Sequence, residues 1–349
     1  MKRLGNILWI LISFTATAIL AVTLLIPYIP PQSPFNIISS LNLAFPYALV
    51  FSILCAVICL IRRQFYTFLW VFIILLLSIP NIVKSFGFSG QQPTTTPTLS
   101  VTSYNVHYFN FYDKDEPNAL LYLQENQADI LCIQELLVLP ENTHTLAKLT
   151  QTLSQYPYHH IYFTHQGKRM HKGIATFSKY PIIKQEIAPI DSKSHAAISS
   201  WIKVNNDTLQ VINCYLESNR LTREEKDIYK SDEKSNIIRR IYNKLAQASQ
   251  KRGKQAELVA ALKDSTCATL VCGDLNDVAT SYVYRTIAQD DTDTFLHLQS
   301  GIGNTFHEGL YRFRIDYIFA DKHIEPLSFG INKQPYSDHY PIELQCNIK

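Results

Sequence analysis

Acidic, amide and imidazole side chains stand at the points where short apolar runs of this sequence stop. The set consists of Asn105, Glu135, Asp274, Asn276, Asp316, Asp338 and His339. Carboxylate and amide oxygens are the hard ligands that Mg²⁺ prefers, and an imidazole beside a carboxylate can hold or transfer a proton. Each fragment alone has a simpler reading, since Gly-Asp-Leu-Asn-Asp at 273–277 could be a turn or a helix cap. Together they indicate metal-assisted acid–base chemistry.

The apolar runs that carry these residues have the length and composition of β-strands. Strands are predicted at 99–106, 129–134, 173–178, 196–204, 208–216, 268–273, 314–320 and 341–346. Helices are predicted at 117–127, 143–155, 237–263 and 281–289. This irregular alternation predicts one α/β domain over residues 99–349, with a large sheet core and with the polar residues at strand ends.

The order and combination of these motifs resemble the endonuclease/exonuclease/phosphatase superfamily of metal-dependent phosphoesterases over residues 99–349. The most specific match pairs Gly-Asp-Leu-Asn at 273–276 with Ser-Asp-His-Tyr-Pro-Ile at 337–342. The segment 172–182 is also similar to an internal strand and turn of the family, although ordinary core packing explains it better. The resemblance implies a four-layered α/β sandwich, in which helices flank two mixed β-sheets.

The resemblance further implies hydrolysis of phosphate esters, above all phosphodiesters, by in-line attack of water. It implies a site for Mg²⁺, or for Mn²⁺, at Asn105, Glu135 and Asp338. It implies catalytic roles for Tyr215, Asp274, Asn276, Asp316 and His339. Asp274 and Asn276 would position the water and bind phosphoryl oxygens, and Asp316 would pair with His339. Chemistry supports that pair independently, because a carboxylate fixes the tautomer of an imidazole and stabilises its charged form. The sequence is compatible with His339 either as a base or as a group that stabilises phosphate oxygens.

Tyr215 departs from the pattern of many relatives. Family members that resemble deoxyribonucleases and sphingomyelinases have histidine at this position, whereas abasic-site endonucleases carry tyrosine. A phenol with a pKa near about 10 is expected to donate a hydrogen bond rather than to protonate a leaving group near neutral pH. Asn213 is assigned to substrate binding and support of the site, and His307 to substrate contact. A surface loop histidine is the simpler reading of His307.

Residues 1–83 predict a membrane anchor. Uncharged stretches at about 7–26, 43–61 and 65–83 are each long enough to cross a hydrocarbon core, which takes roughly 20 residues. Buried core helices are the alternative for all three stretches. A cleaved signal peptide is the alternative for the first, but no small-residue cleavage pattern follows Ile26. Residues 84–98, which are rich in proline and threonine, predict an extended linker.

The net charge of +3 divides unevenly along the chain. The anchor contains the bases Lys2, Arg3, Arg62 and Arg63 and no acid, while the rest contains 28 bases and 29 acids. The positions of these bases predict a cytoplasmic N-terminus and a catalytic domain outside the cytoplasm, which is periplasmic in a bacterium and otherwise extracellular. An inverted topology with a cytoplasmic enzyme is the alternative.

Residues 220–254 are rich in lysine and arginine. The segment could be a solvated helix face, or a cationic rim for a phosphate-bearing polymer or an anionic lipid surface. The expected partners are therefore a phosphate-ester substrate, in nucleic acid or a lipid head group, and a lipid bilayer. Seven cysteines without a C-x-x-C motif predict neither a disulfide framework nor a zinc site. The rival function is a catalytically silent binding or scaffold module that keeps the fold.

Overall fold

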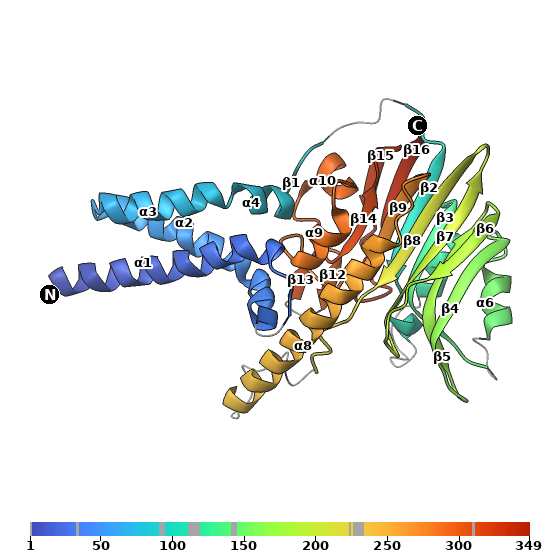
Figure 1. The fold of residues 1–349 in the computed structure, drawn as a ribbon, viewed down its shortest axis with the longest axis horizontal. Helices are drawn as coiled ribbons and strands as arrows, with labels where there is room; N and C mark the ends of the chain where they lie inside the picture. The colour runs from blue at the N-terminus through green and yellow to red at the C-terminus, as the bar shows by residue number, and fades with distance from the viewer. Residues whose placement is uncertain are drawn as a thin grey trace. The chain divides into compact units, whose positions relative to one another are not determined.

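The computed structural model describes residues 2–32, 35–90, 95–110, 119–140, 145–222, 225, 234–308 and 311–349. The chain divides into two compact units. The first unit comprises Met1–Ser85, Asn219–Gly253 and Val278–Arg285. The second unit comprises Phe86–Ser218, Lys254–Asp277 and Thr286–Lys349, and it holds the sheets (Figure 1).

Two six-stranded mixed sheets form the framework of the second unit. The first sheet consists, in spatial order, of β15 (Ile324–Ile331), β16 (Ile342–Ile348), β2 (Leu99–Asn105), β3 (Ile130–Val138), β5 (His171–Ser178) and β4 (Tyr158–Gln166). The second consists of β10 (Thr292–Asp293), β14 (Asp316–Ala320), β9 (Ala268–Asp274), β8 (Asp207–Tyr215), β7 (Ala196–Val204) and β6 (Ile182–Ile187). Each sheet contains a parallel pair, β2 with β3 and β8 with β9, and the other pairs are antiparallel.

Alternating apolar side chains of the two sheets meet in one core. Val101 and Ile130 of the first sheet lie in the same buried cluster as Val211, Leu270 and Ile318 of the second. Every second residue of a strand points to the same face, so one face of each sheet is buried against the other. Burial of apolar surface in this layer is the main stabilising contribution of the second unit.

Helices cover the outer faces of these sheets. On the first sheet, α5 (Ala119–Glu125) and α6 (Leu146–Thr152) bury Leu123 and Leu149 in a cluster with Leu131 and Phe177 of the strands. On the second sheet, Gln210 of β8 donates a hydrogen bond to the carbonyl oxygen of Leu262, just after α8 (Lys234–Ala261). The described residues after Leu99 also form the helices η3 (His107–Asn110), α9 (Tyr282–Ala288) and α10 (Thr294–Leu298). This arrangement confirms the predicted α/β sandwich of two mixed sheets flanked by helices.

The predicted strands and helices are all present, with ends shifted by a few residues, but several strands were missed. Of the long strands, these are β4, β6 and β15, each at the edge of a sheet. The short strands β1 (Gly87–Phe88) and β11 (Ser300–Gly301) pair with each other, as do β12 (Phe306–Glu308) and β13 (Tyr311–Phe313). Because β1 lies within it, part of the predicted linker 84–98 has secondary structure. Residues 91–94 of the linker lie outside the described residues.

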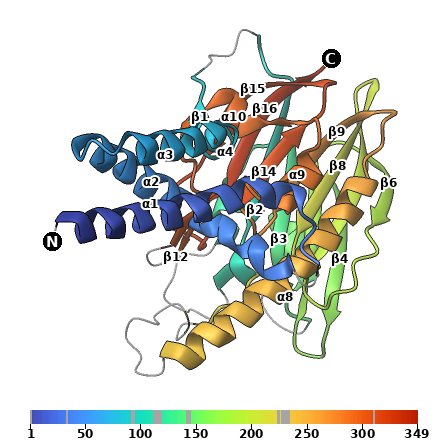
Figure 2. The ribbon, with the colours of Figure 1, turned by 60° about the vertical axis from the view of Figure 1, so that its left-hand side comes forward.

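The first unit contains the apolar N-terminal helices (Figure 2). They are α1 (Lys2–Leu25), η1 (Ile26–Tyr28), η2 (Phe35–Ala44), α2 (Phe45–Ile61), α3 (Phe65–Leu77) and α4 (Ile79–Ser85). Helices at Gly5–Tyr28 and Ile38–Ile61 are long and apolar enough to cross a membrane. Polar contacts join the helices, since Trp70 Nε1 donates to Thr17 Oγ1 at 3.0 Å and Asn81 donates to the carbonyl oxygen of Thr23.

The third predicted span is bent. Helices α3 and α4 meet at an angle of 48°, so this segment crosses a membrane only if the bent pair acts as one span. The bend has a local cause, because Pro80 lacks the backbone N–H that would bond to residue 76, and its ring collides with that carbonyl. All seven cysteines are free thiols.

Candidate active site

The strand ends of the second unit gather most of the predicted site residues. Asn105 is the last residue of β2, and Tyr215 and Asp274 end the parallel strands β8 and β9 side by side. Asp316 begins β14 and is paired directly with Asp274 across the antiparallel ladder. His339 is joined to β12 by an isolated β-bridge with Phe306. The fold therefore places residues separated by more than 200 positions in one polar cluster.

A buried ion pair forms the centre of the cluster. His339 Nδ1 lies 2.9 Å from Asp316 Oδ2, and His339 Nε2 lies 3.8 Å from Asp274 Oδ2. Burial alone disfavours the charged imidazole, but the carboxylates of Asp316 and Asp274 outweigh it and raise the pKa of His339 well above its usual value. The folded protein therefore favours a cationic His339 with its Nε2 proton directed toward the cluster.

Asp274 is a buried carboxyl whose pKa is raised. Burial raises the pKa of this carboxyl to about 8, with His339 opposing and Asp316 adding to the shift. The preceding Gly273 has φ 134°, and a Cβ there would lie 1.9 Å from the carbonyl oxygen of Cys214. Only glycine lets β9 approach β8 so closely at this point, which fixes the position of the Asp274 carboxylate.

Asn276 forms two hydrogen bonds with Asp274. Its backbone N–H donates to Asp274 Oδ1 at 2.8 Å, and its side-chain Nδ2 donates to Asp274 Oδ2 and to the carbonyl oxygen of Leu216, both at 3.0 Å. Asn276 adopts φ 51°, a left-handed conformation that asparagine tolerates better than most residues. This turn directs the amide toward the same carboxylate that faces His339.

Glu135 lies in an irregularity of β3. The pairing of β3 with β5 shifts register between Ile133 and Leu136, and Glu135 itself has φ 51°. A bulge of this kind can redirect a side chain out of the regular alternation of a strand. Glu135 Oε1 accepts hydrogen bonds from Tyr215 at 2.7 Å and from Asn105 Nδ2 at 3.2 Å. Among the described residues, no hydrogen bond ends on its second oxygen, Oε2.

Tyr215 donates its proton to Glu135 within this network. The ring is 5% exposed, and burial together with the charge of Glu135 raises the pKa of the phenol well above its usual value. Tyr215 is therefore a permanent hydrogen-bond donor in this structure. The proton points to Glu135, so Tyr215 supports that carboxylate directly.

Asn105 joins two carboxylates through its amide nitrogen. Nδ2 donates to Glu135 Oε1 and, at 3.0 Å, to Asp274 Oδ2, while Oδ1 accepts the backbone N–H of His107. In this conformation Asn105 orients Glu135 rather than presenting its oxygen to a cation. Asp338 is 24% exposed and lies 3.7 Å from His107 Nδ1, and no bond within the described residues joins it to Glu135 or Asn105.

Two sets of groups offer ligands for a divalent cation. Ligand atoms of Asp274, Asp316 and His339 all lie within 4.8 Å of one another. That set is fully buried, and a cation bound there would displace the 2.9 Å pair between His339 and Asp316. Glu135 fits better, because its Oε2 is free within the described part of the chain, the side chain is partly exposed, and carboxylate oxygen is the ligand that Mg²⁺ prefers.

The two residues assigned to substrate contact lie in different settings. Asn213 is fully buried; its Oδ1 accepts from Gln134 at 2.7 Å and its Nδ2 donates to the carbonyl oxygen of Ala175 at 2.8 Å. It joins the two sheets, so this geometry does not support direct contact with substrate. His307 lies on β12, where it stacks on Tyr340 with ring centroids 3.8 Å apart. Its Nε2 is buried without a partner among the described residues.

A second buried pair beside Tyr215 was missed from the sequence. His195 Nδ1 lies 2.9 Å from Glu217 Oε2, and its Nε2 accepts the backbone N–H of Ser218 at 3.2 Å. The His195 ring packs against Tyr215 with centroids 4.7 Å apart. His195 stands at the start of a predicted strand and outside the acidic motifs, and only the pairing of β7 with β8 reveals its neighbour. Thr305 was also missed; its Oγ1 accepts the backbone N–H of Asp316.

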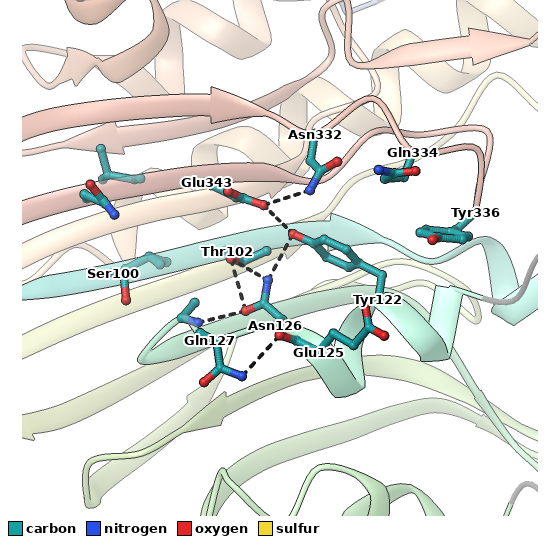
Figure 3. A pocket seen from close by; sticks show the side chains of 14 residues that line it. Ser100, Thr102, Tyr122, Glu125, Asn126, Gln127, Asn332, Gln334, Tyr336 and Glu343 are labelled. Carbon is teal, nitrogen blue, oxygen red and sulfur yellow. Dashed lines mark hydrogen bonds between the residues drawn. The ribbon is translucent and has the colours of Figure 1, made fainter.

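The pocket drawn in Figure 3 contains none of the predicted site residues. It has a volume of about 450 Å³ and lies where α5 meets β2 and β16. Its polar groups bond to one another, since Tyr122 donates to Glu343 Oε1 at 2.6 Å and Asn126 donates to the Tyr122 hydroxyl at 3.0 Å (Figure 3). The candidate chemistry is therefore assigned to the strand ends and not to this pocket.

Comparison with known proteins identifies the family of the second unit. The model of the Endonuclease/Exonuclease/phosphatase family matches residues 102–339, a range that includes all ten predicted site residues. A second family model, Domain of unknown function (DUF8431), matches residues 5–85. Among curated proteins, none matches the sequence.

Solved structures share the fold at low sequence identity. An endonuclease/exonuclease/phosphatase from Beutenbergia cavernae is 17% identical, with a TM-score of 0.53, and the match covers 72% of each chain. A mannosyl-6-phosphatase from Bacteroides thetaiotaomicron is 15% identical, with a TM-score of 0.51, and covers 72% of this chain and 100% of its own.

A third similar structure is the 3′ phosphatase NExo from Neisseria, bound to a product DNA hairpin. It is 16% identical, with a TM-score of 0.51, and the match again covers 72% of this chain and 100% of that one. At such identities the likeness establishes the fold and not the substrate. Members of the matched family are hydrolytic phosphoesterases, including nucleases and phosphatases. The family match over most of the chain, on a fold that carries the expected strand-end cluster, shows that this protein belongs to the Endonuclease/Exonuclease/phosphatase family.

Proposed function

We propose that this protein is a membrane-anchored, divalent-metal-dependent hydrolase of phosphodiesters. One observation carries the proposal: His339, held by Asp316 at 2.9 Å, faces the Asp274 carboxyl at 3.8 Å, while Oε2 of Glu135 accepts no hydrogen bond within the described part of the chain. Hydrolysis by an activated water requires a positively charged hydrogen-bond donor, a base and a carboxylate that can hold the metal ion.

The roles of the residues follow from their protonation. Mg²⁺ or Mn²⁺ held by Glu135, when bound, would withdraw charge from a phosphoryl oxygen. Asp274 accepts the proton of the attacking water, because a base is most effective when its pKa lies near the working pH. The water oxygen forms a bond to phosphorus as the bond to the leaving oxygen breaks. His339 then serves as a charged hydrogen-bond donor to the phosphoryl oxygens and not as the base.

The other polar groups support these steps. Asn276 donates from its amide, and its two bonds to Asp274 orient the base toward the water. Tyr215 and Asn105 hold Glu135 through its Oε1, so that Oε2 is directed to the cation. Asp338 completes the proposed metal site directly or through water. His307 is the proposed substrate contact on β12, and its buried Nε2 has no partner among the described residues.

The charge of the second unit limits the substrate class. This unit contains 16 basic and 24 acidic residues, a net charge of −8 with histidine neutral. Binding of long nucleic acids depends strongly on the neutralisation of phosphates by lysine and arginine. A small phosphodiester, above all a phospholipid or sphingolipid head group, is therefore favoured over long nucleic acid.

The apolar helices of the first unit support anchoring in a membrane. We place the N-terminus in the cytoplasm and the catalytic unit outside it, because bases precede the first span and follow the second. A reporter that is active on only one side of the membrane, fused after Lys349, tests this orientation. Activity on the cytoplasmic side would contradict it.

A substrate panel tests the proposed activity. The full chain, purified in detergent, is incubated with Mg²⁺ and with single-stranded DNA, double-stranded DNA, RNA, sphingomyelin, phosphatidylglycerol or a chromogenic phosphodiester. We expect metal-dependent release of product from at least one phosphodiester, and loss of that release in Glu135→Gln. A folded chain that hydrolyses none of them, and binds neither Mg²⁺ nor Mn²⁺ in calorimetry, would instead be the silent module.

A further inference from the structure

One face of α8 runs past the ends of the two long apolar helices of the first unit. Ile238, Tyr242, Ser249 and Gly253 are spaced by four, seven and four residues, which at about 3.6 residues per turn places them on one side of the helix. We call this stripe of four residues the α8 face. All four residues belong to the first unit.

The C-terminal end of the α8 face is packed where the first candidate span ends and the second begins. Ser249 and Ser39 share a buried hydrogen bond, and Ser39 lies one residue inside the span Ile38–Ile61. A Cβ on Gly253 would lie 2.4 Å from Pro31 Cγ, so the helix backbone meets the residues that follow the span Gly5–Tyr28. With the two helices spanning a membrane, as proposed above, this end of α8 lies where they leave the hydrocarbon core.

The N-terminal end of the same face carries two exposed side chains. Ile238 is 58% exposed and Tyr242 is 50% exposed, although both point to the side on which Ser249 is buried. At about 1.5 Å per residue, Ile238 lies roughly 16 Å along the helix from Ser249, beyond the contact with Ser39. A large aliphatic residue and a tyrosine side by side on one exposed face of a helix are typical of an interfacial helix.

The positive charge around the α8 face favours contact with an anionic surface. Residues 219–253 contain ten basic and five acidic residues, and the whole first unit contains 16 basic and five acidic residues, a net charge of +11. Arg239 and Arg240 directly follow Ile238 and are both exposed. The second unit has a net charge of −8, so nearly all attraction toward anionic groups comes from the first unit.

We propose that the exposed end of the α8 face, with Ile238 and Tyr242 inserted between head groups and Arg239 beside them, docks on an anionic lipid surface. This inference rests on the proposed anchoring in a membrane. Arginine suits the position because its aliphatic stem can lie along apolar surface while its charged head stays among phosphates. The basic segment thus acts as a lipid contact and not as a binding rim for nucleic acid.

Fluorescent labels on the full chain test the docking. Tyr242→Cys places an environment-sensitive fluorophore on the proposed lipid-facing side, and Gln247→Cys is the matched control, because residue 247 is exposed on the opposite side of α8. Both variants also carry Cys267→Ser, since Cys267 is the partly exposed native thiol and the other six are buried. Each is reconstituted into vesicles of phosphatidylcholine alone or of an equimolar mixture with phosphatidylglycerol, with a quencher attached to a fraction of the lipids.

We expect the label at 242 to be quenched at least about twofold more than the label at 247 in the phosphatidylglycerol vesicles. The difference should shrink in phosphatidylcholine, and also when salt rises from about 0.1 M to about 1 M, which shortens the Debye length from about 10 Å to about 3 Å. Arg239→Gln should reduce it in the same direction. Equal quenching at both positions, in vesicles that carry the chain, would overturn the proposal.

Flotation of the same vesicles separates this result from a failure of anchoring. A chain that does not float with either kind of vesicle refutes the proposed membrane anchor, whatever the labels report. Protection of the label at 242 by a single-stranded oligonucleotide, with no response to lipid, would assign the basic segment to nucleic acid and would also overturn the docking proposal.

Discussion

Replacing Tyr215 by phenylalanine tests whether the phenol acts through Glu135. The substitution removes a 2.7 Å hydrogen bond to a carboxylate from a side chain that is 5% exposed and leaves the ring in place. Hydrogen bonds to charged groups contribute about 1.5–3 kcal/mol, and each 1.36 kcal/mol corresponds to about a tenfold change in rate. We therefore expect Tyr215→Phe to lower kcat/KM by about tenfold to about 150-fold.

The concentration of metal needed for half-maximal rate should rise in the same variant. Glu135 loses one of the two donors that hold its Oε1, so its free oxygen is less well oriented toward a cation. The assay is hydrolysis of a chromogenic phosphodiester by the full chain in detergent, over a series of Mg²⁺ concentrations. Tyr215→His should recover part of the rate, since imidazole can also donate to the carboxylate.

Tyr156→Phe is the matched control. Tyr156 is buried in the same unit and donates to the carbonyl oxygen of Asn126, away from the strand-end cluster. Its loss should lower the thermal stability and leave kcat/KM and the metal response unchanged. If Tyr215→Phe kept the full rate and the full metal response, or if Tyr156→Phe matched its loss, the reasoning about Glu135 would be refuted.

Three further substitutions probe the cluster and its surroundings. Asp316→Asn removes the carboxylate that holds His339 in its charged form, and loss of one group that stabilises transition-state charge lowers a rate by about 100-fold to about 1000-fold, so kcat/KM should fall by at least about 100-fold. Asp293→Asn breaks a buried ion pair elsewhere and should lower the free energy of unfolding by about 3–5 kcal/mol without changing kcat/KM. Equal rates in the two variants would count against the assignment. Burial lowers the pKa of His160 to about 4, so the unfolded chain binds a proton at this residue before the folded chain does as pH falls below about 6.5. The free energy of unfolding should therefore fall by about 2 kcal/mol by pH 5. His160→Gln should abolish that loss in unfolding experiments, and an unchanged pH dependence in this variant would contradict the assignment. Asn213→Ala should lower the free energy of unfolding by about 1–3 kcal/mol without changing KM, and a raised KM would restore its predicted contact with substrate.

The inner strands of both sheets could be predicted from the sequence because both of their faces are covered. They read as continuous apolar runs, as in β3 and β9, whose residues are nearly all buried. Three long strands were missed: β4, β6 and β15 lie at sheet edges and carry many partly or fully exposed residues. An edge strand needs polar side chains to avoid pairing with other chains, and these side chains give its sequence the composition of a loop.

The residue types of the site could be predicted, but their contacts could not. The sequence indicates a carboxylate at 135 and a phenol at 215, whereas the bond between them depends on the bulge in β3 and on the facing of the two sheets. The same holds for His195, whose partner Glu217 follows a different strand. Long-range pairing of this kind is set by tertiary packing, which no local pattern encodes.

Hydrolysis of a single chromogenic phosphodiester by the full chain and by His339→Ala, with Mg²⁺ and with a chelator, tests the central claim most directly. We predict release of the chromophore by the unsubstituted chain only when Mg²⁺ is present, and a rate for His339→Ala at least about 100-fold lower at equal thermal stability. Equal rates for the two chains, or hydrolysis that persists in the chelator, would contradict metal-dependent catalysis at this strand-end cluster.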